Sequence, residues 1–279
     1  MELIWDILLD ALADSGKMLP FLLLAYLLME AAEHHVSGKM EGALRKMGKA
    51  GPLVGALLGC LPQCGFSATA ANLFAAGLVT PGTLLAVFLA TSDEAVPLML
   101  GSEAGREMIL PLLLCKAAVG VLAGYLVDLV LWRDHKRHLH ELCGHCGCDD
   151  NHGILRPALW HTVHIWVFIL LVNVLLNGAM ELLGQERISA LLLSGSIFQP
   201  FAAALIGLIP NCAASVMLTQ LYLAGSLSFG ACLAGLCSGA GIGLAVLLKM
   251  NQDKKENLRV ILMLYLISAL CGVGFQLFF

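Results

Sequence analysis

The sequence predicts an all-α integral membrane protein made of two repeats with inverted topology. Hydrophobic residues occupy 59% of the 279 positions, charged residues occupy 13%, and the mean hydropathy is +0.84. A soluble domain carries about 25% charged residues, so this composition indicates a membrane protein. The other two observations are a match of the chain to itself after a shift of 148 residues, and a polar break at the same point of both copies.

Eight apolar stretches follow one another along the chain, each long enough for a helix of about 20 residues. They cover residues 16–33, 51–79, 82–100, 107–131, 157–182, 195–226, 228–248 and 257–279. They form two sets of four, which match the duplication. We therefore expect a first transmembrane repeat over residues 1–131, a His/Cys-rich linker over 132–156 and a second transmembrane repeat over 157–279.

The duplication is clearest where residues 52–100 align with residues 200–248 without a gap, with identical residues at 14 of the 49 aligned positions. In this register the Pro-Gln-Cys that ends at Cys64 lies on the Pro-Asn-Cys that ends at Cys212. An apolar chain duplicated in this way, with a helix-breaking motif in each copy, is typical of a secondary transporter.

Basic residues mark three loops as cytoplasmic. Lys and Arg gather in residues 34–50, 132–156 and 249–259, whereas the N-terminus and residues 101–107 and 183–190 are acidic or near neutral. Positive charge stays on the cytoplasmic side of a membrane. The pattern predicts a multi-pass protein of the cell (inner) membrane, with the His/Cys loop in the cytoplasm and both termini outside.

This orientation requires one apolar stretch in each half to return to the side from which it entered. Residues 51–79 are the candidate in the first half, since a Pro-Gln-Cys-Gly break divides them into two arms. The equivalent stretch would enter from the opposite face, so that two re-entrant hairpins meet near the midplane. Such backbone is tolerated there only when protein or a cavity surrounds it. The alternative is ten short spans. Three or five crossings per half are both odd numbers, so the halves are inverted in either case.

The two hairpin tips are the candidate substrate site. Proline leaves preceding carbonyl groups free, which suits cations, and the free N–H groups of the next arm, expected to begin at Ser67 or Ser215, favour anions. Amide and thiol side chains add neutral or soft ligands. The candidate residues are Gln63, Cys64, Ser67 and Asn72 in the first copy and Asn211, Cys212, Ser215 and Gln220 in the second. The structural alternative is a packing kink.

Asp93 and Glu94, next to Ser92, lie in the middle of an apolar stretch and are the candidate site for a coupling proton or cation. A carboxylate at membrane depth costs about 3 kcal/mol on insertion scales and marks a functional site by default. An acidic pair that reaches solvent at a helix end is the alternative. Lys116 lies inside the next apolar stretch, where it either pairs with these carboxylates or snorkels to the interface.

The linker between the halves holds five histidines and three cysteines. Thiolate and imidazole groups bind zinc, copper(I) and other soft ions. The spacing fits no zinc-finger pattern, which favours a flexible metal acceptor or sensor. The alternative is a polar linker with incidental metal affinity. The candidate ligands are Cys143, His145, Cys146, Cys148 and His152.

At this point the chain resembles a family of proposed heavy-metal exporters related to the arsenic permeases, some of whose members are labelled manganese transporters. The resemblance rests on the His/Cys-rich loop, on Leu-Pro-Gln-Cys-Gly-Phe-Ser at 61–67, on Thr-Ser-Asp-Glu at 91–94 and on Ile-Pro-Asn-Cys at 209–212. It implies a permease, often described with ten spans, that exports a metal, metalloid or organoarsenical. As(III) would need the thiols of Cys64 and Cys212, whereas Mn(II) would prefer Asp93 and Glu94.

Taken together, the sequence predicts a secondary transporter that exports a metal or metalloid ion by alternating access. No nucleotide-binding motif is present, so the drive would come from a proton or cation gradient. The expected partners are the lipid bilayer, a small ion or small-molecule substrate and a second copy in a homodimer, with no nucleic acid and no required cofactor apart from a metal as substrate or loop ligand. A cation-coupled carrier of organic anions is the alternative function. A metal sensor also stays open, and an enzyme is disfavoured because no nucleophile–base pair stands out.

Overall fold

The computed structural model describes residues 50–92, 95–130, 155–183 and 196–278, together with residues 5, 9, 11–13, 15–20, 22–24 and 26–27. Within these residues all regular structure is helical, and no strand occurs. The helices from residue 65 onward are α3 (Gly65–Ala75), α4 (Pro81–Ala90), α5 (Ala95–Leu100), α6 (Glu103–Val130), α7 (Leu155–Leu183), α9 (Gln199–Gly207), α10 (Cys212–Leu223), α11 (Phe229–Ser238), α12 (Ile242–Met250) and α13 (Lys254–Phe278). A further short helix covers Ala50–Gly59.

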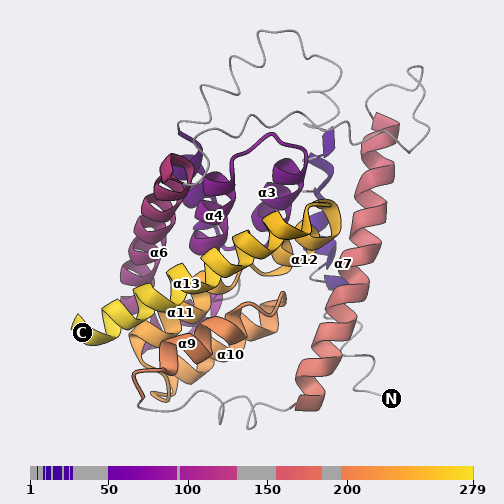
Figure 1. Ribbon diagram of the computed structural model, residues 1–279. Helices are drawn as coiled ribbons and strands as arrows, with labels where there is room; N and C mark the ends of the chain where they lie inside the picture. The colour runs from indigo at the N-terminus through magenta and orange to yellow at the C-terminus, as the bar shows by residue number, and fades with distance from the viewer. Residues whose placement is uncertain are drawn as a thin grey trace.

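Five stretches among the described residues are long and apolar enough to cross a membrane, and they divide into an inner and an outer group. Phe229–Met250 is 94% buried and Pro81–Leu100 is 75% buried, whereas Gly105–Val130, Ala158–Leu176 and Lys254–Phe278 are only 22–28% buried. Exposed leucines and valines cover the outer helices. The outer group therefore presents apolar side chains to lipid, and its helices α6 and α13 lie along α4 and α11 of the inner stretches (Figure 1).

Both inner stretches are interrupted. α4 ends at Ala90 and α5 begins at Ala95, while α11 ends at Ser238 and α12 begins at Ile242. A chain interrupted in a bilayer exposes polar backbone groups, which is costly unless protein surrounds them. Burial of these two stretches meets that requirement.

The helix Ala50–Gly59 runs parallel to α4 and at the same depth. A Cβ atom added to Gly55 would lie 3.0 Å from the Thr83 carbonyl oxygen, and one added to Gly59 would lie 2.6 Å from that of Val87. α3 lies between these two helices in the chain and must therefore run back in the opposite direction. Residues 50–75 thus form two antiparallel helical arms joined at the predicted Pro-Gln-Cys break.

The second half repeats this packing 148 residues later. α9 lies along α11, with Gly207 against Gly235 and Ser238, as Gly59 lies against Val87 and Ala90. A glycine pair also joins the inner helix of each half to the long helix that follows it. Gly82 of α4 meets Gly124 of α6, and Gly230 of α11 meets Gly272 of α13. The duplicated sequence therefore adopts the same local structure twice.

The turns that end the two hairpins match as well. Gly77 and Gly225 take φ values of +77° and +74°, which residues with a side chain rarely adopt. The amide of Gly77 donates to Phe74 and that of Gly225 to Tyr222, each at 2.9 Å. Only a residue without a Cβ adopts this turn at low cost, which accounts for glycine in both copies.

The two halves interlock through their short helices. α3 packs against α12, where Gly243 lies on Ser67 (Figure 1). The Tyr26 hydroxyl contacts Asn72 of α3 and Met250 of α12, so α12 follows α3 in the same direction. In the matching arrangement α10 packs against α5. Each hairpin is thus completed by the broken helix of the other half.

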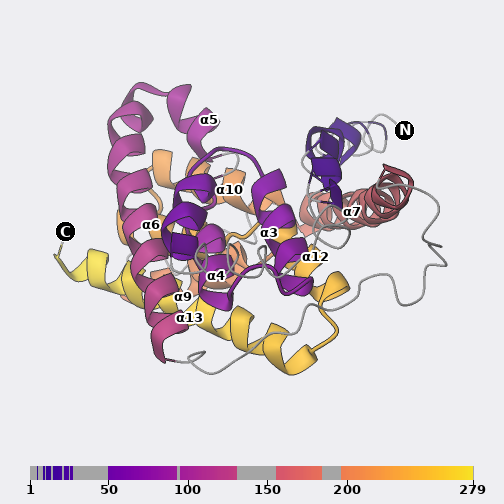
Figure 2. The ribbon, with the colours of Figure 1, turned by 90° about the horizontal axis from the view of Figure 1, so that it is seen from above.

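The N-terminal helix and α7 stand together beside this core, as Figure 2 shows from above. The indole N–H of Trp166 donates to the Ser15 carbonyl oxygen at 2.9 Å, and the amide of Asn173 donates to the Ser15 hydroxyl at 3.1 Å. At the other end Tyr26 stacks on His161 with ring centroids 5.5 Å apart. The two helices are therefore antiparallel neighbours.

Candidate functional site

Four helix interruptions lie near one another. Two are the hairpin tips, at residues 60–64 and 208–211, and two are the breaks of the inner helices, which follow α4 at Ala90 and α11 at Ser238. The glycine contacts place each tip beside the break of its own half, because Gly59 reaches Ala90 and Gly207 reaches Ser238. The interlocked packing of α3 with α12 and of α10 with α5 then brings both halves together.

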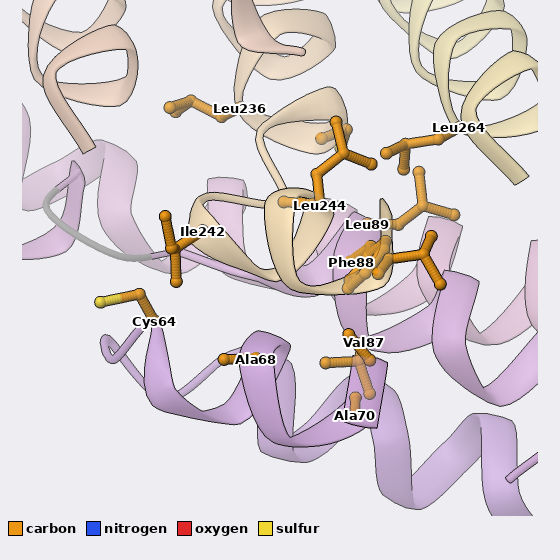
Figure 3. Close-up of a cluster of buried hydrophobic side chains, with 14 of the residues drawn as sticks. Cys64, Ala68, Ala70, Val87, Phe88, Leu89, Leu236, Ile242, Leu244 and Leu264 are labelled. Carbon is orange, nitrogen blue, oxygen red and sulfur yellow. The ribbon is translucent and has the colours of Figure 1, made fainter. Parts of the chain in front are cut away.

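The first tip places a buried thiol at the start of α3. Cys64 is 7% exposed and takes the N-cap position of α3 without a side-chain capping bond. The hydroxyl of fully buried Ser67 donates to the Cys64 carbonyl oxygen at 2.8 Å. Figure 3 shows Cys64 at the N-terminal start of α3, next to Ile242 of α12. Gln63 is partly exposed, and its side-chain amide donates to the Lys17 carbonyl oxygen at 3.3 Å.

The second tip shares one backbone hydrogen bond with the first tip but has a different cap. The backbone amide of Asn211 donates to the Ile209 carbonyl oxygen at 2.7 Å. The backbone amide of Gln63 makes the equivalent bond to the Leu61 carbonyl oxygen in the first tip. The side-chain oxygen of Asn211 accepts a bond from the Ala213 amide at 3.0 Å and caps α10. Cys212 and Ser215 follow in the first turn and are 7% and 6% exposed. Both tips thus hold a buried cysteine and, three residues later, a buried serine.

The break between α4 and α5 exposes backbone oxygens inside the core. Thr91 and Ser92 are buried, and their hydroxyls donate to the carbonyl oxygens of Val87 and Ala90. Asp93 and Glu94, the predicted coupling residues, lie outside the residues that the structure describes. The break between α11 and α12 holds Gly241, whose φ of +54° and ψ of −146° require glycine.

Lys116 joins the two broken helices. Its side chain is completely buried, and its ammonium group donates to the carbonyl oxygens of Thr91 and, at 2.6 Å, Leu236. The snorkelling that the sequence allows for this residue is therefore wrong, because the helix break offers carbonyl acceptors within the core. The sequence signal is a single basic residue within the apolar stretch 107–131.

Two residues predicted at the tips lie away from them. Asn72 is two turns along α3, where its side-chain oxygen accepts from the Tyr26 hydroxyl at 3.1 Å. Gln220 lies equally far along α10 and is exposed. The second arms also begin earlier than predicted, at Gly65 and Cys212 instead of Ser67 and Ser215, since the turn needs only the residues up to the cysteine. The predicted loop ligands from Cys143 to His152 lie outside the described residues.

The site offers groups of several kinds to a small ligand. The helix breaks supply carbonyl oxygens, the starts of α3 and α10 supply amide groups, and Cys64 and Cys212 supply buried thiols. Within the described part of the chain no three His, Cys, Asp or Glu side chains come close enough to hold a metal ion together. A ligand held by these residues would therefore use backbone and hydroxyl oxygens beside the thiols.

Comparison with known proteins identifies a family. No curated protein and no solved structure matches this chain. The sequence profile of a family described as "Putative, 10TM heavy-metal exporter" matches residues 1–183 and residues 163–278. These segments together cover almost the whole chain. The chain belongs to this family of multi-span heavy-metal exporters.

Proposed function

We propose that the protein exports a metal or metalloid ion by secondary active transport, with the substrate held where the hairpin tips meet the broken helices. The observation that carries the proposal is the convergence of four helix interruptions, with buried Cys64 and Cys212 at the tips and buried Thr91 and Ser92 at the first break. Interrupted helices place partial charges of both signs at the membrane midplane and form substrate sites in secondary transporters. The family membership supplies the class of substrate.

In this proposal the two tips bind the substrate and the first break couples transport to a gradient. Cys64 and Cys212 donate thiol ligands, while Gln63, Asn211, Ser67 and Ser215 add oxygen and amide groups. Asp93 and Glu94, beside Ser92, exchange a proton or cation. The second break carries Gly241 and Ile242 at the equivalent positions, which supports one coupling site for two binding tips.

We propose further that the halves are inverted and that the chain lies in the inner membrane with residues 34–50, 132–156 and 249–259 in the cytoplasm. The shared direction of α3 and α12 supports inversion. α3 runs opposite to α4, whereas α12 continues the inner stretch that begins with α11, the counterpart of α4. The inner stretches of the two halves therefore run in opposite directions. Alternating access would then exchange the conformations of two similar halves around a fixed site.

Transport in liposomes tests the proposal. Purified protein in sealed liposomes is assayed for uptake of Mn(II), Zn(II) and As(III), with and without a proton gradient. We expect gradient-dependent transport of at least one ion, and a loss of about tenfold or more in the variant that combines Cys64→Ala with Cys212→Ala if a thiol-seeking ion is the substrate. Asp93→Asn should abolish coupling to the gradient.

Cys232→Ala combined with Cys271→Ala is the matched control. Both residues are free cysteines away from the tips, Cys232 fully buried near the start of α11 and Cys271 partly buried in α13. Equal losses in the two double variants would show that thiol removal acts through packing. A folded wild-type preparation that moves none of the three ions would contradict metal export.

One observation favours an organic-anion carrier as the second candidate. α3 begins at the buried tip without a side-chain cap, so its first amide groups face the site with the positive end of a helix. A carboxylate-bearing solute would be held there, with the coupling cation near Asp93. Competition by organic acids without any effect of metal ions would support this candidate.

A further inference from the structure

The ammonium group of Lys116 occupies a position where two helices end. Thr91 follows the last residue of α4, and Leu236 lies in the last turn of α11. The final carbonyl groups of a helix have no partner within the helix and carry its negative end. Lys116 donates to one such oxygen in each half of the molecule.

The backbone leaves the Leu236 oxygen available for this contact. In an uninterrupted helix it would accept from the amide of Ala240, but that amide donates to Ser238 at 2.9 Å. The Thr91 oxygen is released because α4 stops before α5 begins. Carbonyl oxygens at the ends of unwound helices are the groups that bind Na⁺ or K⁺ in membrane proteins.

The charge at this position comes from one half only. The residue 148 positions after Lys116 is Leu264, which is also completely buried. A completely buried cation within a membrane is costly and needs close acceptors. A general packing role would be served by an apolar side chain, as it is at Leu264.

We propose that Lys116 is a tethered substitute for a bound monovalent cation, so that the transporter holds its two broken helices together without Na⁺ or K⁺. This inference rests on the proposed function in treating the four interruptions as the transport site. The ammonium carries the same single charge as Na⁺ or K⁺ and donates hydrogen bonds to the same oxygens. Because α6 carries it covalently, it is present at every step and at any external ion concentration.

Replacement of the side chain should convert the position into a cation site. Lys116→Ala removes the charge and leaves space beside the Thr91 and Leu236 oxygens. Lys116→Met removes the charge but fills the space. Leu264→Ala is the control, because it opens the equivalent space in the second half, where the wild-type residue is leucine and carries no charge.

The experiment is thermal unfolding of purified protein in detergent, in NaCl, KCl or N-methyl-D-glucamine chloride at equal ionic strength. For Lys116→Ala we expect a saturable rise of about 5 °C in Tm with Na⁺ or K⁺ over N-methyl-D-glucamine, beyond any rise that wild type shows. Lys116→Met and Leu264→Ala should respond to the salts only as wild type does.

The proposal is overturned if Lys116→Ala responds to no cation, or if Leu264→Ala responds equally. It is also overturned if Na⁺ or K⁺ stabilises wild-type protein by as much as it stabilises Lys116→Ala. A Lys116→Ala protein that fails to fold in every salt while Lys116→Met folds normally would overturn it as well. Because none of these readings needs a substrate, they stand whether or not metal transport is found.

Discussion

Gly241 is the residue at which the backbone leaves α11 and enters α12 with a positive φ. Its φ of +54° and ψ of −146° lie in a region that is nearly restricted to glycine. An alanine at this position would strain the backbone by about 1–3 kcal/mol. We expect Gly241→Ala to lower the Tm in detergent by several degrees and to reduce transport, because the break lies at the proposed site.

Gly178 provides the control for this prediction. It lies within α7, and an added Cβ would meet no atom within 4 Å. Gly178→Ala should leave the free energy of unfolding unchanged or raise it by about 0.5–1 kcal/mol, because alanine has a higher helix propensity than glycine. Equal effects of the two substitutions on the Tm would show that the positive φ of Gly241 carries no cost.

For single residues, the sequence predicts which positions belong to the site better than it predicts which atoms they contact. Cys64 and Cys212 follow prolines in a repeated motif, so their place at the tips could be read from the pattern. The acceptors of Lys116 could not, since Leu236 lies 120 residues away and its oxygen is freed only by the break that follows α11. Such a contact depends on tertiary packing, which no local pattern contains.

Between helices, the start of α4 is fastened by a carboxylate from α6. Asp128 accepts hydrogen bonds from the Thr80 hydroxyl at 2.6 Å and from the Gly82 amide at 2.8 Å. A negative charge at a helix N-terminus is favourable, and hydrogen bonds to charged groups contribute about 1.5–3 kcal/mol. We expect Asp128→Ala to destabilise the protein by about 2 kcal/mol and to lower its Tm by about 4 °C.

At the start of α11, the counterpart of α4, other residues bind the first backbone amides. The side-chain oxygen of Gln199 accepts from the Ser228 amide at 3.1 Å, and the Ser228 hydroxyl accepts from the Ala231 amide at 3.2 Å. Gln276, the equivalent of Asp128, donates instead to the Ser196 carbonyl oxygen at 3.3 Å. Gln276→Ala should therefore cost less than Asp128→Ala. A loss as large as that of Asp128→Ala would contradict the capping role.

The hairpins show how far charge counting can predict elements in a membrane protein. Basic loops on one side and neutral loops on the other left one stretch per half that had to turn back. The parallel course of Ala50–Gly59 and α4 shows that the chain reverses direction at the Pro-Gln-Cys break of the first half. The caps of α3 and α10 could not be predicted from the repeat, because Asn211 caps its helix while Gln63 bonds to Lys17.

Across the whole molecule, the interlocking of the halves is what joins the four interruptions. α12 completes the first hairpin and α10 packs on α5, so neither half encloses its own site. Alternating access in such an arrangement requires the two halves to face opposite sides of the membrane. The loops before α6 and before α13 hold equivalent positions in the two repeats and should therefore lie on opposite sides.

Glu103→Cys and Gln252→Cys test this orientation, since both residues are exposed and lie next to the starts of α6 and α13. They are introduced into a protein whose native cysteines are replaced by alanine or serine, and whole cells are treated with a membrane-impermeant maleimide. We expect labelling of Glu103→Cys and protection of Gln252→Cys until the cells are opened, because the basic residues near 252 hold that loop in the cytoplasm. Labelling of both cysteines in intact cells would place the two loops on one side and would rule out inverted halves, and with them the exchange of conformations between the repeats.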